Sequence, residues 1–236
     1  MKRSEVIRFL ILRTVGIFLV LFAIFGILAT FGPALYYEVS FKISQARGIT
    51  YVVSAQSLPQ NPSRPNQTIS STGIDNFAQV LTGAKQQILV PKDTKFSILI
   101  PKIGVSAKVF PNVDASNPSD FLPILMQGVA HARGTVFPGQ KGNIYLFAHS
   151  TDNFWDVGRY NAVFYLLKDL KPGDDVIIFF ENKRYDYVVT GSKTVDPSNV
   201  SYLVNAQKKN QEQLILQTCW PPGTTLQRLL VFGKPK

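Results

Sequence analysis

Residues 214–231 read LILQTCWPPGTTLQRLLV and contain the only cysteine of the chain, Cys219. Two apolar runs flank a segment with two prolines and a glycine, and this pattern predicts two β-strands joined by a loop. Cys219 stands at the end of the first run and Arg228 at the start of the second. If the two strands are antiparallel neighbours, both side chains reach the same rim of one sheet.

Short apolar runs of the same kind recur from residue 92 to the C-terminus. Their β-branched and aromatic residues, with Gly, Pro and Asn between them, predict further strands at FSILI, NIYLFAH, DVIIFF and RYDYVVT. Residues 181–183, Glu-Asn-Lys, predict a hairpin, and helical patterning is confined to short stretches at residues 121–127 and 162–170. Many short strands within residues 92–236 predict a mainly β domain, either a small closed barrel or a sandwich.

The N-terminal region predicts a membrane anchor. Residues 14–37 carry no charge, and about 20 apolar residues suffice for a helix to span a bilayer. Residues 1–13 hold four Lys and Arg, and positive charge beside a first helix tends to stay in the cytoplasm. A retained transmembrane helix is favoured over a cleaved signal peptide, because the run is long and no clear small-x-small cleavage site follows it. We therefore expect a single-pass cell-membrane protein whose N-terminus is cytoplasmic.

Residues 38–91 are predicted to form an extracellular stalk. Its core, SAQSLPQNPSRPNQTISSTG, is rich in Ser, Asn, Gln and Pro and poor in aliphatic residues. Such a segment buries too little surface to offset its ordering entropy, so it is interpreted as a flexible spacer. The spacer would hold the folded domain, residues 92–236, away from the membrane.

Composition excludes several classes of function. The chain has 25 Lys+Arg against 15 Asp+Glu, but the basic residues are scattered, without a compact basic run interleaved with aromatics, so no nucleic-acid partner is predicted. One cysteine excludes an internal disulfide, and with only two histidines it argues against a Cys/His zinc site. The carboxylates near turns are interpreted as solvated or turn-forming rather than as a metal cluster: Asp152, Asp156, Asp174, Asp175 and Glu181.

Three residues at predicted strand ends have side chains suited to covalent acyl transfer. The thiolate of Cys219 is a nucleophile, His149 at the end of NIYLFAH is a candidate proton carrier, and the Arg228 guanidinium suits a developing oxyanion. Cys219 and His149 each have a structural alternative, namely a buried core cysteine and a hydrogen-bonded histidine. The other histidine, His131 in GVAHARGT, is expected to be structural, because nothing near it in the sequence marks a catalytic partner.

The segment from about residue 95 to residue 236 resembles the sortases, membrane-anchored cysteine transpeptidases of Gram-positive-type cell surfaces. The similarity runs in order through the domain, in the segments ILIPKIGV, GVAHARGTVFPGQKGN, NIYLFAHS, LKDLKPGDDVII, YDYVV, ILQTC and TTLQRLLV. ILQTC is similar to the family's Thr-Leu-x-Thr-Cys signature, with Ile215 in place of its first threonine. Ala148 stands where a glycine often precedes the family's histidine, and the spacer lacks the Asp-Pro-aromatic lid motif of many pilus-building sortases.

The resemblance implies an eight-stranded β-barrel and a two-step reaction. It places the nucleophile on Cys219, the acid/base on His149 and the essential arginine on Arg228, with backbone amides near Thr218 supporting the oxyanion. It also implies that residues 194–213 help to shape the substrate pocket. Calcium orders that region in several sortases, but no ligand set here supports it, so no cofactor is predicted.

The implied partners are surface proteins with a sorting signal similar to Leu-Pro-x-Thr-Gly, an amine acceptor from cell-wall precursor or pilin, and the lipid bilayer. Two alternatives stay open from the sequence. One is a membrane-anchored thiol hydrolase or protease of surface peptides, in which water resolves the thioester. The other is a non-catalytic tethered binding module whose cysteine is buried.

Overall fold

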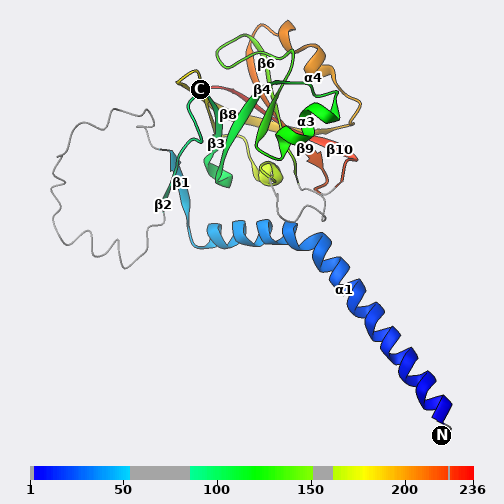
Figure 1. Cartoon of the computed structure of the whole chain (residues 1–236). Coiled ribbons are helices and arrows are strands. Elements are labelled where there is room, and N and C mark those ends of the chain that lie inside the picture. The colour runs from blue at the N-terminus through cyan, green and yellow to red at the C-terminus, as the bar shows by residue number, and fades with distance from the viewer. Residues whose placement is uncertain (1–2, 54–85, 151–161, 223) are drawn as a thin grey trace, which may run out of the picture.

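The computed structural model describes residues 3–53, 86–150, 162–222 and 224–236, with residues 29–37 described by their backbone alone. Its main body is a closed barrel of eight strands with short helices around it (Figure 1). This confirms the predicted mainly β fold and selects the barrel over the sandwich. Most of the predicted spacer, together with Asp152 and Asp156, lies outside the described residues.

The strands of the barrel follow one another in the order β10-β8-β7-β3-β4-β5-β6-β9, and β9 pairs with β10 to close it. Neighbouring strands are antiparallel except for β4–β5 and β6–β9, which are parallel. The bounds are β3 (Phe96–Ile100), β4 (Val105–Val113), β5 (Val129–Ala132), β6 (Gly142–Phe147), β7 (Asp175–Phe180), β8 (Lys183–Val195), β9 (Glu212–Trp220) and β10 (Gln227–Pro235).

A parallel pair requires a crossover connection, and short helices lie in both crossovers. The helix α3 (Pro118–Leu125) connects β4 to β5 and overlaps the first predicted helical stretch. The connection from β6 to β9 contains η3 (Tyr165–Asp169), α4 (Ser201–Val204) and η4 (Ala206–Lys208), where η denotes a 3-10 helix. The second predicted helical stretch is therefore a 3-10 turn, and a further one, η1 (Pro101–Ile103), follows β3.

Several strands are buried on both faces, which explains why their sequences are continuous apolar runs rather than alternating ones. In β6, Ile144 and Leu146 belong to the cluster inside the barrel, to which all eight strands contribute, whereas Tyr145 and Phe147 belong to a cluster outside it. The outer cluster is covered by residues of α3 and α4, and Phe121 of α3 meets Phe147 edge-on with 6.1 Å between ring centroids.

The predicted hairpin at residues 181–183 is confirmed. Glu181 and Asn182 adopt φ values of 48° and 62°, the positive values that a two-residue type I′ turn requires between twisted strands. The second strand of this hairpin, β8, runs to Val195, further than the predicted run, because its C-terminal half pairs with β10.

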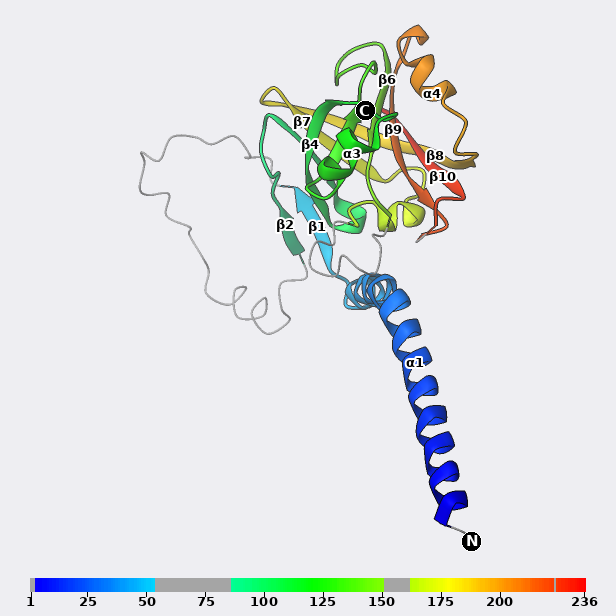
Figure 2. The same ribbon diagram turned by 45° about the vertical axis from the view of Figure 1, so that its right-hand side comes forward.

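The N-terminal helix α1 (Arg3–Ala46) contains residues Ser4–Leu28, an exposed span of 25 residues that includes a window of 18 residues with a mean hydropathy of 2.5. This span is long and apolar enough to cross a membrane, but it begins ten residues earlier and ends nine residues earlier than the predicted span at residues 14–37. After Gly48, which has a φ of 67°, the chain forms β1 (Thr50–Val53), and β1 pairs in parallel with β2 (Gln86–Leu89). Figures 1 and 2 show this small ribbon beside the barrel, a feature that the sequence did not predict.

Candidate active site

Cys219 and Arg228 lie directly opposite each other on the antiparallel strands β9 and β10. Residues opposed in this way have Cβ atoms about 5 Å apart, so a guanidinium on one strand reaches the thiol on the other. Both residues are half-buried, and the cysteine is a free thiol. Arg228 Nη1 donates hydrogen bonds to Thr225 O and Gln227 O, both at 3.1 Å, which ties the guanidinium to the loop that joins the two strands.

His149 reaches the same site from the other side of β9. In the parallel β6–β9 pair, Phe147 lies opposite Gln217, and Ala148 N donates to Gln217 O at 3.2 Å just beyond the end of β6. Continuing this register by two residues brings His149 level with Cys219. The central strand β9 therefore carries the thiol, with the imidazole on one flank and the guanidinium on the other.

The three residues belong to the outer face of the barrel wall. Side chains alternate across a strand, and Leu216 and Leu229 lie in the interior cluster whereas Ile215 and Leu230 lie in the outer cluster. The same alternation puts Cys219 and Arg228 on the outer face. Cys219, His149 and Arg228 are each partly exposed, whereas residues that face the interior of the closed barrel are buried.

Thr218 points the other way and is buried. Its hydroxyl donates a 3.0 Å hydrogen bond to Ala148 O, the carbonyl that immediately precedes His149. The Thr218 side chain therefore joins the end of β6 to β9 at the level where the two candidate catalytic residues meet.

A tyrosine–glutamine pair lies next to these residues, and the sequence reasoning missed it. The Tyr145 hydroxyl donates to Gln217 Oε1 at 2.6 Å, and both residues are on the outer face. Burial raises the pKa of the Tyr145 phenol, and the positive charge of Arg228 acts in the opposite direction. The signal was available in NIYLFAH, since Tyr145, Phe147 and His149 alternate onto one face of a strand.

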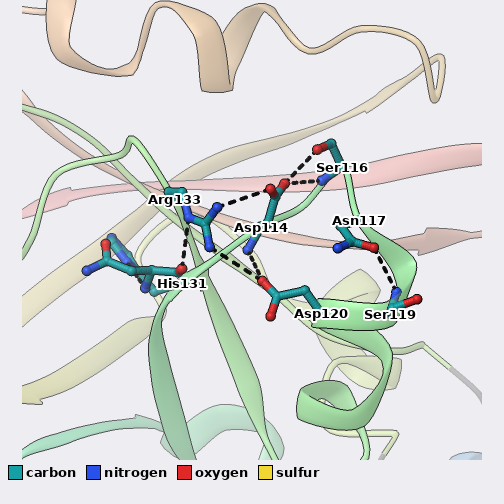
Figure 3. A network of polar contacts seen from close by, with 8 residues as sticks. Asp114, Ser116, Asn117, Ser119, Asp120, His131 and Arg133 are labelled. Atoms are coloured by element: carbon teal, nitrogen blue, oxygen red, sulfur yellow. Dashed lines mark hydrogen bonds and ion pairs between the residues drawn. The ribbon is translucent and has the colours of Figure 1, made fainter.

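An ionic network lies at the start of α3, where β4 and β5 end (Figure 3). Arg133 Nη1 donates to Asp114 Oδ2 at 3.2 Å, and Arg133 Nη2 lies 3.7 Å from Asp120 Oδ2. The Asn117 side chain caps α3 by accepting from Ser119 N at 3.1 Å. Because the Arg133 guanidinium forms ion pairs with both Asp114 and Asp120, it balances the negative charge of these two carboxylates.

Within the described ranges, no group of three or more His, Cys, Asp and Glu side chains is arranged to hold a metal ion. His131, the competing histidine, lies on β5 and is completely buried, in line with the structural role expected for it.

The protein combines a closed barrel of eight strands with a cysteine that faces an arginine across the β9–β10 hairpin. This combination of fold and site can be compared directly with known protein families. The Sortase domain family model matches residues 98–236. The chain belongs to the sortase family.

Individual relatives agree with this assignment. The chain is 27% identical to Sortase D of Bacillus subtilis (strain 168) over 138 residues, a match that covers 57% of this chain and 60% of that protein. It is 24% identical to Sortase A of Listeria monocytogenes over 216 residues, covering 91% of this chain and 88% of that protein. The crystal structure of sortase C-1 from Actinomyces oris is 26% identical with a TM-score of 0.51, covering 61% of this chain and 76% of that one.

Proposed function

We propose that this chain is a membrane-anchored cysteine transpeptidase that cleaves a C-terminal sorting signal and joins the cleaved protein to an amine. The observation that carries the proposal is the cross-strand pair of Cys219 and Arg228 in the fold of the sortase family. The β6–β9 register, continued two residues past Phe147, supports His149 as their partner. Membership of that family supports the transpeptidase reaction in particular.

In the first step, the Cys219 thiolate attacks the backbone carbonyl of the scissile peptide bond. A C–S bond forms, and the carbonyl oxygen becomes an oxyanion that Arg228 stabilises as its charge develops. The C–N bond then breaks as His149 gives its proton to the leaving amine. The product is a thioester between Cys219 and the N-terminal part of the substrate, with the histidine left neutral.

In the second step, an amine attacks the thioester carbonyl. His149 takes a proton from the attacking nitrogen, a new C–N bond forms, and the C–S bond breaks to regenerate the Cys219 thiolate. Arg228 again faces the oxyanion. Since the same three groups serve both steps, the outcome depends on whether an amine or water reaches the thioester first.

The proposed substrates are surface proteins with a signal similar to Leu-Pro-x-Thr-Gly, and the proposed acceptor is an amine of cell-wall precursor or of a pilin. The enzyme would be single-pass, with a cytoplasmic N-terminus and an extracellular barrel. The apolar span of α1 supports the anchor, and the basic residues Lys2 and Arg3, which precede this span, support the orientation.

The test is intact mass spectrometry of the full chain in lipid nanodiscs with a panel of peptides carrying such signals. We expect a peptide adduct on Cys219, absent from Cys219→Ala, that is converted to an amide product only when an amine such as oligoglycine is supplied. An adduct resolved by water even when amines are present would replace the proposal with a thiol hydrolase. A thiol that forms no adduct with any peptide and resists alkylation would leave a non-catalytic binding module.

A further inference from the structure

The end of α1 that follows the apolar span is docked on the barrel. Glu38 Oε2 lies 2.8 Å from Lys168 Nζ on η3, and Lys168 Nζ also binds Asp169 Oδ2 at 3.0 Å. One turn further along α1, Phe41 packs against the cluster inside the barrel. We call the contacts of Glu38 and Phe41 with the barrel the juxtamembrane clasp.

The ion pair of the clasp differs from an ordinary surface pair. Exposed pairs contribute little because both charges stay solvated, but here the side chains of Lys168 and Glu38 are only 21% and 25% exposed. Hydrogen bonding to Lys168 lowers the pKa of Glu38, and although burial opposes the charge of Lys168, its bonds to Glu38 and Asp169 raise its pKa. Both groups therefore stay ionised across the physiological range.

The clasp acts on the segment that returns to the barrel after His149. Phe164 N, just before η3, donates a 3.2 Å hydrogen bond to His149 O. Phe164 and Leu167 are completely buried in the interior cluster, which fixes η3 against the barrel. The helix that emerges from the membrane is thus one short turn away from the backbone of the candidate acid/base.

A second contact attaches the chain to the barrel before the predicted spacer begins. The ring of Tyr51 on β1 lies so close to Gly104, at the end of η1, that a Cβ atom there would be 2.9 Å from it. Tyr51 and Val53 also pack on a buried cluster that includes residues of β3 and β7. Because β1 pairs with β2, the described chain lies on the same two-stranded ribbon up to residue 53 and again from residue 86. Residues of both strands, among them Tyr51 and Leu89, pack with β3 and β7 of the barrel.

We propose that the juxtamembrane clasp fixes the orientation of the barrel on its anchor, with the end that carries the active site turned toward the bilayer. Figures 1 and 2 agree that the β9–β10 turn lies on the side of the barrel nearer to α1. The consequence for substrates rests on the proposed function. A sorting signal that emerges from the same membrane meets the site at a set height, whereas a soluble peptide gains nothing from the clasp.

The orientation is measured without catalysis. In nanodiscs, the sole cysteine, Cys219, is labelled with a donor fluorophore and the lipid headgroups carry an acceptor. In the Glu38→Lys variant, the efficiency of fluorescence energy transfer from Cys219 to the headgroups should fall by at least about half. The reason is that the barrel can then rotate about the short connection at residues 47–49. Lys168→Glu in the same chain should restore the efficiency. Arg184→Glu, which reverses a charge in an ion pair on β8 outside the clasp, is the matched control and should have no effect.

The substrate consequence has its own readout. Glu38→Lys should lower turnover of a membrane-inserted sorting signal by about tenfold and leave turnover of the soluble peptide unchanged, with rescue in the charge-swapped chain. Equal efficiency of fluorescence energy transfer in the wild type, Glu38→Lys, the charge-swapped chain and Arg184→Glu would overturn the proposal that the clasp fixes the orientation. If the fluorescence energy transfer changes as expected but the wild-type chain cleaves neither substrate, the proposal about the clasp stands and the proposed function fails.

Discussion

The two histidines of this barrel lie on or just beyond the adjacent strands β5 and β6, and they differ in burial and in position. His131 on β5 is completely buried, whereas His149, just past β6, is half-buried at the end of the strand, level with Cys219. Both follow apolar runs in the sequence. The difference comes from the surroundings of each side chain. The His131 ring contacts Phe96 and Phe137, whereas β6, which His149 follows, pairs with the strand that carries the thiol.

The contacts of His131 require one neutral tautomer. Its Nδ1 accepts from Asn112 N at 3.3 Å, so the ring proton belongs on Nε2, which lies 3.1 Å from Val136 O and 3.0 Å from Thr135 Oγ1. The ring stacks on Phe137 with 4.5 Å between centroids. An imidazole held between backbone groups and an aromatic ring stabilises a fold and has no path along which to exchange protons with a substrate.

The sharpest test of the comparison is to remove the imidazole of His149. We expect His149→Ala to lower the rate of peptide transfer by roughly 10²–10⁴-fold, because the leaving amine then lacks a positioned acid. The melting temperature should stay close to that of the wild type. Steady-state transfer assays and calorimetry on the same preparation measure both, and a transfer rate within threefold of wild type would reject His149 as the proton carrier.

Removing the other imidazole should have the reverse effect. His131→Ala leaves a cavity and unpaired partners at Asn112 N and Val136 O, so we expect the free energy of unfolding to fall by about 2–4 kcal/mol. Transfer per folded molecule should be nearly unchanged. Urea unfolding, combined with active-site titration to count folded molecules, separates the two quantities. A variant as stable as wild type but inactive would invert the assignment of the two histidines.

The pH dependence of stability offers a finer distinction. Burial lowers the pKa of His131 below its ordinary 6.5, so the unfolded chain binds a proton more readily than the folded one. Stability conferred by the neutral ring is present above pH 6.5 and is lost as pH falls from there toward the folded-state pKa, with a slope of at most about 1.4 kcal/mol per pH unit. Unfolding curves between pH 7 and pH 5 should show this slope in wild type, and His131→Phe should remove it.

The smallest expected effect comes from the hydrogen bond between Thr218 on β9 and the backbone just after β6. Thr218→Val removes the hydroxyl that binds Ala148 O, which should cost about 1–2 kcal/mol of stability. Because that bond holds the backbone next to His149, transfer should also slow by roughly three- to tenfold. Thr218→Ser keeps the hydroxyl and should recover the rate; a serine variant as slow as valine would show that the methyl group matters instead.

Much of the fold follows from local patterns. Strands buried on both faces must be continuously apolar, so runs such as FSILI and NIYLFAH are visible in the sequence. The hairpin at residues 181–183 was predictable because only a few residue types accept positive φ. The β1–β2 ribbon was not, since four-residue strands carry little pattern and their pairing joins segments that are distant in the chain.

The sequence by itself determined the long apolar N-terminal helix, six of the eight barrel strands and the single thiol, because each depends on residue type and local period. The strands β4 and β5 were not predicted from the pattern. Tertiary structure decided the complete burial of His131, the direct opposition of Cys219 and Arg228, and the hydrogen bond between Tyr145 and Gln217. It also decided the contact between Glu38 and Lys168, which are 130 residues apart. These features depend on strand order and register, and those are set by the packing of the whole barrel rather than by any one segment.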